Sequence, residues 1–488
     1  VVKTSSVIGY QSGATISTTG TDFDNDEGNS GGFVGKVVGG TIQGTQDQYC
    51  LADQLKVING SQNVGGFAGN IQPGSAVTLN TSSNTGLLSK LLKYLLGNAG
   101  NLAKVLNATL SIVDYAKVDA WNDYGLSVNG SYTLENDENT KYANQAGGFV
   151  GTAGGAIFGD KDANSVRVEA NNIRNVVGGR HAGGFFGLAD VSSVAQVGND
   201  DSDQILNLIK LGNIDVLDAF RTYVYQAKVT GSNDNGLSVC ANDESQEGTL
   251  DSKVQTGNAG GFGGSLLDGS IKNSSVTGLN KVKAKNYAGG FVGHMGKSGV
   301  VDLDEAGVGT GKLLNATAGV LDIFGSHSDN CSVIGIPVGF TISSESGKEP
   351  ISGGFVGYAD LGRMSNCNVE NIKKVASDQI AGGFVGKTSF EYLADIDLGS
   401  SYLLDPILSI VNKLLDILYV GDLENVGLID INLGSLLKLQ VLAKGNALSV
   451  TLLGLTISVA LDKDRGDGTS DLAKITIGDS YIEIPCSN

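Results

Sequence analysis

Apolar and polar residues alternate along short stretches of this chain. In residues 156–173 and 270–285 the alternation has a period of two, which is typical of a β-strand with one buried face. Gly, Asn, Asp and Ser interrupt the pattern every few residues and favour turns at those places. The pattern therefore predicts many short strands joined by turns.

A glycine-rich motif, Gly-Gly-Phe-x-Gly, recurs between these strands. Gaps between successive motif phenylalanines alternate between short (29–36 residues) and long (64–82 residues), so the motifs form four pairs. Matching members of successive pairs lie 93–116 residues apart, which indicates about four large repeats of roughly 90–120 residues. The motif phenylalanines are Phe33, Phe67, Phe149, Phe185, Phe262, Phe291, Phe355 and Phe384.

Another segment recurs ahead of the motif pairs. The stretch from Ser6 (SVIGYQSGATIST) resembles that from Ser332 (SVIGIPVGFTISS), and weaker relatives begin at Gly125 and Gly236. The stretch from Ala447 (ALSVTLLGLTISV) resembles a fifth copy. We therefore expect the chain to begin and end at the same phase of the large repeat.

Coils of 29–36 residues that are rebuilt from short strands indicate a parallel β-solenoid. No coil can bury its apolar face alone, so coils stack at the ~4.8 Å spacing of hydrogen-bonded strands. We predict a mainly β fold, namely one continuous, elongated, right-handed parallel β-solenoid over residues 1–488. The motif glycines would allow positive φ and close backbone approach at each corner of a coil. Each motif phenylalanine would point inward and stack on the next.

Leucine-rich segments occupy the long gaps between motif pairs. Similar stretches occur in the other long gaps and after the last motif, and in the first gap the leucines at helical spacing are Leu87, Leu88, Leu91, Leu92, Leu95 and Leu96. We predict amphipathic helical lobes, one inserted at the equivalent place of each large repeat. Their approximate ranges are 85–116, 202–220, 311–324 and 401–420. The leucine faces would either lie on the flank of the solenoid or project and contact other molecules.

The stretches AGGFVGTAGGAI, AGGFFGLADVSSV and SGGFVGYADLGRMSNCNV resemble GLUG-type repeats. The resemblance covers all four motif pairs, whereas the long inserts depart from a plain GLUG array. Such repeats occur in bacterial surface and adhesin-like proteins that form β-solenoids. The resemblance therefore implies an extracellular or cell-surface location, and it implies no particular ligand.

The net charge of the chain argues against some classes of binding partner. The chain has 488 residues, of which 51 are acidic and 33 basic, and its formal net charge is −18. Nucleic-acid binding needs basic stripes that neutralise phosphate, and docking on anionic membranes also needs positive charge. No uncharged apolar run reaches the ~18 residues of a membrane-spanning helix. We therefore expect no nucleic-acid partner and no membrane insertion.

Two acidic clusters are candidate calcium sites. The first comprises Asp22, Asp24 and Asp26, and the second comprises Asp462, Asp464 and Asp467. Calcium takes six to eight oxygen ligands, which alternating carboxylates in one loop can supply. Neither cluster matches the EF-hand loop, and solvated turn acids are the alternative. No other cofactor is expected.

The five cysteines are widely spaced and form no Cys-x-x-Cys pair, so a zinc site is not expected. Cys331 and Cys367 are close enough in sequence to suggest a disulfide between neighbouring repeats. The alternative is that both are buried free thiols.

Patterns that support catalysis are scarce. His181, His294 and His327 lie in no nucleophile or metal motif. The glycine motif lacks the following helix and the lysine of a phosphate-binding loop. Paired acids such as Asp302 and Asp304 could serve glycoside cleavage on a β-helix, but few arginines accompany them. We therefore expect no enzymatic activity.

These observations favour an extracellular structural protein, either a segment of a surface adhesin stalk or the subunit of a filament. Open solenoid ends present unpaired strand edges that template pairing, and residues 1–18 and 472–486 both resemble strands. We expect self-association by head-to-tail stacking. The alternative is a carbohydrate- or ligand-binding adhesin module with calcium-stabilised loops. Its partners would be glycans or proteins of a host or cell surface.

Overall fold

The structure is a computed structural model, and parts of the chain are described in it. The described residues are 1–20, 27–74, 110–133, 140–142, 145–190, 221–242, 257–296, 325–360 and 362–389, together with six strands between 392 and 485. For residues 131–133 and 140–142 and for the six last strands, the backbone alone is described.

Four parallel sheets, here called A to D, contain most of the strands. Sheet A comprises β1 (Val2–Lys3), β6 (Thr41–Gln43), β10 (Ser111–Asp114), β17 (Ala156–Phe158), β21 (Tyr223–Tyr225), β26 (Ser270–Lys272), β30 (His327–Asp329) and β35 (Arg363–Ser365). Sheet B comprises β2 (Ser6–Ile8), β3 (Ala14–Ser17), β7 (Cys50–Asn59), β11 (Ala116–Ala120), β12 (Leu126–Asn129), β18 (Val168–Gly178), β22 (Ala227–Gly231), β23 (Leu237–Ala241), β27 (Ser275–Ala284), β31 (Ser332–Gly335), β32 (Phe340–Ser344), β36 (Asn368–Glu370) and β37 (Ile372–Ser377).

Sheets C and D flank the glycine motif. Sheet C comprises β4 (Ser30–Gly31), β8 (Asn63–Gly65), β15 (Gln145–Gly147), β19 (His181–Gly183), β24 (Asn258–Gly260), β28 (Tyr287–Gly289), β33 (Ile351–Gly353) and β38 (Ile380–Gly382). Sheet D comprises β5 (Val34–Val38), β9 (Ala68–Gln72), β16 (Val150–Gly154), β20 (Phe186–Asp190), β25 (Gly263–Leu267), β29 (Val292–Gly296), β34 (Val356–Asp360) and β39 (Val385–Ser389). A hairpin of β13 (Ser131–Thr133) and β14 (Thr140–Tyr142) precedes β15.

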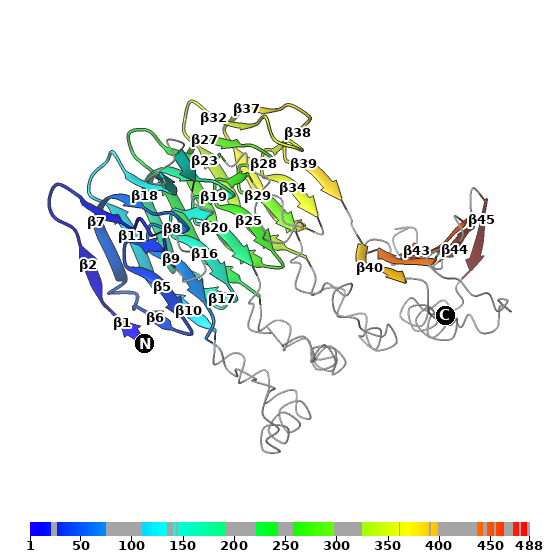
Figure 1. Cartoon of the computed structure of the whole chain (residues 1–488), viewed down its shortest axis with the longest axis horizontal. Coiled ribbons are helices and arrows are strands. Elements are labelled where there is room, and N and C mark those ends of the chain that lie inside the picture. Colours follow the sequence, from blue (N-terminus) through cyan, green and yellow to red (C-terminus); the bar gives the residue numbers. More distant parts are fainter. Residues whose placement is uncertain are drawn as a thin grey trace, which may run out of the picture.

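The chain passes through sheets A, B, C and D in that order and then repeats the circuit. Each circuit is one coil, and coils 1 to 8 stack in chain order because the strand order of sheet D follows the sequence without crossovers. Figure 1 shows the strands following one another from the blue end to the yellow end. All pairings between coils are parallel, so the described coils form the predicted parallel β-solenoid. The right-handed winding stays a prediction.

Coils alternate between two forms, which explains why the motifs form pairs. In the even coils 2, 4 and 6, sheet B holds one long strand of 10 or 11 residues. In the odd coils two shorter strands replace it, and both pair with the same long neighbour, as β11 and β12 do with β18. Sheet B bends at this place, and the bend requires a positive φ, which Asn172 (55°) adopts within β18 and Gly125 (93°) adopts in the odd-coil loop before β12.

The weaker sequence relatives at Gly125 and Gly236 prove to match one half of the stronger copies. Ser127 of β12 pairs with Val57, as Thr15 of β3 does. Strand β2, which begins the copy at Ser6, instead pairs with the first half of β7. The segment therefore recurs as a second sheet B strand in coils 3 and 5.

The long inserts leave the solenoid at one equivalent place. Strands β9, β20 and β29 end coils 2, 4 and 6, and the described chain resumes at residues 110, 221 and 325. The predicted helical content is not supported, because the described residues contain no helix. Residues 111–114 and 116 of the first predicted helix are strand, since β10 and β11 pair with coils on both sides. The rest of that range and the ranges 202–220, 311–324 and 401–420 lie outside the described residues.

The last strands differ from the parallel coils predicted through residue 488. They are β40 (Tyr392–Leu398), β41 (Leu437–Leu442), β42 (Ala447–Leu452), β43 (Leu455–Asp462), β44 (Leu472–Ile477) and β45 (Ser480–Pro485). Each pairs antiparallel with the next. The stretch from Ala447, expected to be a fifth copy of the coil segment, is instead a hairpin, because β42 and β43 pair antiparallel with Leu452 opposite Leu455.

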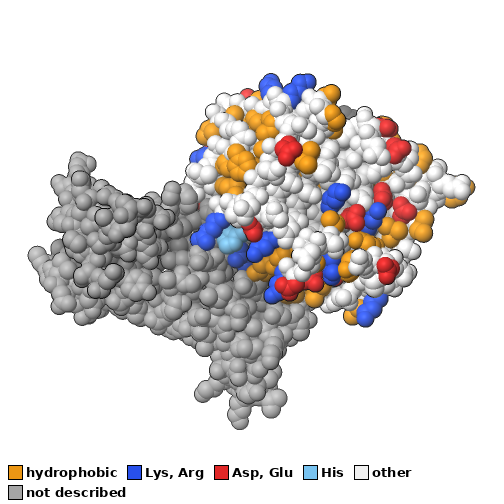
Figure 2. All heavy atoms as spheres, turned by 180° about the vertical axis from the view of Figure 1, so that it is seen from behind, with side chains coloured by type: hydrophobic (Ala, Val, Ile, Leu, Met, Phe, Trp, Pro, Cys, Tyr) orange, Lys and Arg blue, Asp and Glu red, His pale blue; other side chains and the backbone are white. Residues whose placement is uncertain are grey.

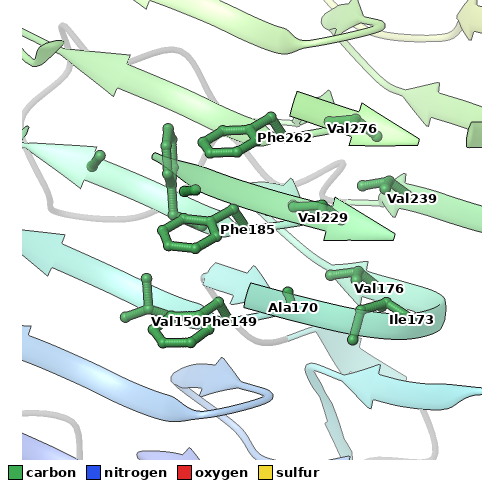
Figure 3. Packing of buried hydrophobic residues seen from close by; sticks show 14 of the residues in the cluster. Phe149, Val150, Ala170, Ile173, Val176, Phe185, Val229, Val239, Phe262 and Val276 are labelled. Atoms are coloured by element: carbon green, nitrogen blue, oxygen red, sulfur yellow. The ribbon is translucent and has the colours of Figure 1, made fainter. Parts of the chain in front are cut away.

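The core lies inside the coils and centres on the motif phenylalanines. Consecutive motif rings stack from Phe33 to Phe384, with centroids 4.6–5.0 Å apart and interplanar angles of at most 19°. That separation matches the spacing of paired strands, so each ring sits one step above the last. Figure 3 shows Phe149, Phe185 and Phe262 in this column, with Val229 and Val276 of sheet B beside it. The prediction of an inward phenylalanine ladder is confirmed.

Candidate functional site

The corner between sheets C and D is built from the glycine motif itself. The Phe149 N–H donates to the Phe185 carbonyl of the next coil (3.0 Å), and the Gly148 N–H donates to the Gly183 carbonyl (3.0 Å). Hydrogen bonds between coils therefore continue through the corner without a break. Such pairing leaves little room for side chains between adjacent turns of backbone.

The second glycine of each motif faces the following coil. A Cβ on Gly148 would lie closer than 3.0 Å to the Gly184 carbonyl oxygen, a separation that real Cβ atoms essentially never show. The same conflict occurs at the equivalent glycine of coils 1 to 7. None of the motif glycines has a positive φ. The predicted close backbone approach is therefore correct, and the predicted use of positive φ at the motif is wrong.

The third glycine of each motif faces the preceding coil. A Cβ on Gly151 would lie 2.6 Å from the carbonyl oxygen of Gly69, and one on Gly386 would lie 2.6 Å from that of Gly357. Each motif therefore meets the steric requirements of two neighbouring coils. Its second glycine makes room for the next coil, and its third glycine makes room for the previous one.

The two outermost coils lack one neighbour each among the described residues. No described atom lies within 4 Å of a Cβ on Gly383 of coil 8, and a Cβ on Gly35 of coil 1 meets one atom, the Asn29 carbonyl oxygen at 3.2 Å. Apolar groups emerge at both places. Phe384 is 37% exposed where Phe355 is fully buried, and Ile8 of coil 1 is 66% exposed. We call the surface around Ile380, Gly383 and Phe384 the coil 8 face.

A buried polar column, missed by sequence reasoning, runs between sheets C and D outside the phenylalanine ladder. Its central part links Asn258 to Ser265 (3.1 Å) and Ser265 Oγ to His181 Nδ1 (2.9 Å). Further along, the His294 ring stacks on Tyr358 with centroids 5.4 Å apart. These positions recur at fixed offsets in each motif copy, four residues before and three residues after the motif phenylalanine. Alignment of the motif copies could therefore have shown that polar residues recur at these positions, although not that they contact one another.

Burial keeps the histidines of this column uncharged. It lowers the pKa of His181 to about 3, with a smaller contribution from the nearby His294 and Arg180. Burial alone lowers the pKa of His294 to about 4. The Ser265 hydroxyl that contacts His181 is itself fully buried. These side chains of the column are therefore shielded from solvent within the described coils.

The acidity of the chain does not reside in the coils. The described residues up to 389 contain 18 of the 51 acidic and 20 of the 33 basic residues, a formal charge of +2. The remaining parts of the chain therefore carry 33 acidic and 13 basic residues, a formal charge of −20. Figure 2 shows Lys, Arg, Asp and Glu interspersed among uncharged side chains on one face of the solenoid. A nearly neutral rod can stack on itself without strong repulsion.

None of the candidate calcium ligands is a residue whose side chain the structure describes. Asp22, Asp24, Asp26, Asp464 and Asp467 fall among residues that the structure does not describe, and Asp462 ends β43 with its backbone alone described. Within the described part of the chain, no group of three or more His, Cys, Asp or Glu side chains could hold a metal ion. That part also contains no helix long and apolar enough to cross a membrane.

Cys331 and Cys367 lie on neighbouring coils, directly opposite one another. Ser332 pairs with Asn368, which places the two preceding cysteines on one rung of sheet B. Both are free thiols in the structure. Cys50 and Cys240 are also free and lie on other coils of sheet B.

A comparison with protein families identifies the repeat. The model of the GLUG motif matches residues 255–283. This match spans β24, β25, β26 and nearly all of β27, which is one full turn of the solenoid. One GLUG unit therefore corresponds to one coil. No curated protein and no solved structure matches the chain.

Proposed function

We propose that the chain is an extracellular structural protein, part of a surface stalk or filament, in which coil 8 of one copy stacks on coil 1 of the next. GLUG repeats occur in surface and adhesin-like proteins, which supports the location and the structural role. The proposal involves no catalysis and no obligatory cofactor. The observation that carries it is the glycine at position 383, which has nothing above it among the described residues.

Glycine weakens a strand, because it loses more backbone entropy on folding than other residues. In the interior of a strand it costs about 0.5–1 kcal/mol relative to alanine. At Gly354 that cost is unavoidable, since a Cβ would collide with the Gly383 carbonyl oxygen. At Gly383 the described coils impose no such demand, and the residue suits a surface on which another coil lies. Gly35 on the opposite side of coil 1 leaves similar space for a preceding coil.

The two end coils also have matching forms. Coil 8 resembles the even coils, since a single residue, Asn371, separates β36 from β37. Coil 1 is an odd coil with a loop between β2 and β3. Stacking coil 1 on coil 8 would repeat the even-to-odd junction found between Phe67 and Phe149, whose rings lie 4.8 Å apart. Such a contact is heterologous and continues without closing, so it builds a filament.

A test uses Gly383→Ala, which adds one methyl group to the coil 8 face. Because no described atom lies within 4 Å of that position, the isolated chain should fold as before. Stacking should be blocked, because the new Cβ would meet the backbone of the next coil. We expect sedimentation and electron microscopy to show concentration-dependent filaments for the parent chain and none for Gly383→Ala.

A matched control is Val338→Ala, which changes an exposed side chain on an odd-coil loop away from the end faces. It should assemble like the parent. A parent chain that stays monomeric at high concentration would refute the proposal, and so would a Gly383→Ala variant that forms filaments equally well.

The second candidate is a carbohydrate- or ligand-binding adhesin module with calcium-stabilised loops. The observation that favours it is the concentration of acidic residues outside the coils. Binding to an array of glycans that disappears on addition of a chelator would support this module over the stacking filament.

A further inference from the structure

One position of sheet B forms a column of mostly small side chains, buried from coil 2 to coil 7, that ends in two cysteines. In coils 1 to 6 this rung holds Ser5, Cys50, Ala116, Val168, Ala227 and Ser274, as the strand registers show. In coils 7 and 8 it holds Cys331 and Cys367. The rung therefore places two thiols on consecutive coils at one point of the described solenoid.

The backbone holds these two residues in direct register. The Asn368 N–H donates to the Cys331 carbonyl oxygen (3.1 Å), so the strands are paired where the cysteines lie. Paired strands run about 4.8 Å apart, which falls within the Cα separation of about 4.4–6.8 Å found in disulfides. Both side chains lie on the inner side of the coil, since Cys331 is buried and Cys367 packs against the core. A bond between the sulfurs therefore needs rotation of side chains and no shift of backbone.

The environments of the two thiols differ. Cys331 is 1% exposed, and its Sγ lies 3.3 Å from the Asp329 carbonyl oxygen. Cys367 belongs to the last described coil and is half-buried, with its Sγ 3.1 Å from the Ser365 carbonyl oxygen. The hydrogen bond from the Cys331 side chain lowers the pKa of Cys367, whereas burial raises the pKa of Cys331. Cys367 is thus the accessible nucleophile, and Cys331 is its protected partner.

We propose that Cys331 and Cys367 form a disulfide that fastens coil 8 to coil 7 when the chain meets a low-molecular-weight disulfide. The Cys367 thiolate attacks one sulfur of the small disulfide, forms a mixed disulfide and releases the other half as a thiolate. The Cys331 sulfur then displaces the second half and forms the bond between the coils, while its proton passes to the departing thiolate. Two protein thiols are oxidised, and one small disulfide is reduced to two thiols.

This bond would act on the coil that carries the coil 8 face. A terminal coil is paired on one side among the described residues and should open more readily than an internal coil. A disulfide enclosing the residues between 331 and 367 restricts that opening. The inference does not depend on the proposed stacking, since the bond lies within one chain.

The test treats the full chain with oxidised glutathione and compares it with chain kept in dithiothreitol. We expect the titratable thiols of the unfolded protein to fall by two and a tryptic map to contain one peptide pair joined through Cys331 and Cys367. Cys331→Ser and Cys367→Ser should each abolish that pair. Cys240→Ser is the matched control, and it should retain the pair because Cys240 lies on another part of sheet B.

A second readout is the rate at which trypsin cleaves native chain at Lys373 and Lys374, which are exposed on β37. Oxidation should slow this cleavage several-fold in the parent chain and leave it unchanged in Cys367→Ser. Recovery of separate glutathione adducts on both cysteines, or of dimers linked through Cys367, would overturn the inference. Filament assembly is not part of either readout, so the inference can fail while the stacking proposal stands.

Discussion

Coil 4 and coil 8 carry nearly the same motif in opposite surroundings. In coil 4, Gly184 has no room for a side chain because the Gly261 carbonyl lies against it, and Phe185 is fully buried between two rings. In coil 8, Gly383 has empty space above it among the described residues, and Phe384 is 37% exposed. This difference in surroundings indicates that the motif forms the interface between neighbouring coils. Its residues have their full effect only where a coil lies on each side.

The largest expected effect is the difference in stability between a valine substitution at Gly184 and the same substitution at Gly383. Gly184→Val would force side-chain carbon against the Gly261 carbonyl oxygen of coil 5, and a backbone atom held in the sheet cannot move aside as the end of a flexible side chain can. We expect a loss of unfolding free energy above about 5 kcal/mol, in the exceptional range for one substitution. Gly383→Val should change the stability of the isolated chain by less than about 0.5 kcal/mol. Urea unfolding followed by circular dichroism measures both, and similar losses in the two variants would contradict the comparison.

A smaller effect is expected for the phenylalanines. Phe185→Ala removes a ring stacked on Phe149 and Phe262, and such truncations in a core cost about 3–5 kcal/mol. Phe384 stacks on one ring, and part of its surface is already exposed, so Phe384→Ala should cost about 1–2 kcal/mol. Thermal unfolding of the two variants at equal concentration compares the two losses of stability. A loss for Phe384→Ala as large as that for Phe185→Ala would show that coil 8 is covered in the isolated chain.

The smallest effect concerns pH and the polar column of the interior. His181 and His294 have folded-state pKa values of about 3 and about 4, below the unfolded value near 6.5. The unfolded chain therefore binds more protons, so stability present above pH 6.5 is lost as the pH falls towards 4. Between pH 7 and 5 each histidine should remove about 2 kcal/mol.

Denaturant unfolding at a series of pH values measures this dependence. His294→Phe keeps an aromatic ring beside Tyr358 and should lessen the loss between pH 7 and 5 by about 2 kcal/mol. Tyr358→Phe is the matched control, since it removes a neighbouring hydroxyl without removing a group that titrates in this range. An unchanged pH dependence in His294→Phe would mean that the ring is accessible to protons in the folded chain.

Sequence reasoning succeeded where the signal was local and repeated. The Gly-Gly-Phe-x-Gly copies predicted the stacked rings, and their spacing predicted four pairs of coils with inserts at equivalent places. The sequence-based prediction was wrong where one local pattern is compatible with more than one secondary structure. The sequence pattern predicts a helix that includes residues 111–114, yet these residues form strand β10 because β6 and β17 lie on either side of it. The stretch from Ala447 repeats the pattern of a coil but pairs back on itself.

The sequence by itself determined the repeating unit, the inward phenylalanine and the absence of side chains at the corner. Each of these follows from residue type and periodicity, which are visible along the chain. Tertiary structure alone decided which neighbouring coil leaves no room for a side chain at each glycine and where sheet B bends. It also decided that His181 lies against Ser265 of the following coil. These features depend on contacts between coils whose residues are tens of positions apart, and the separation varies with the inserts. No local pattern records such contacts, because they arise only when one coil is laid on another.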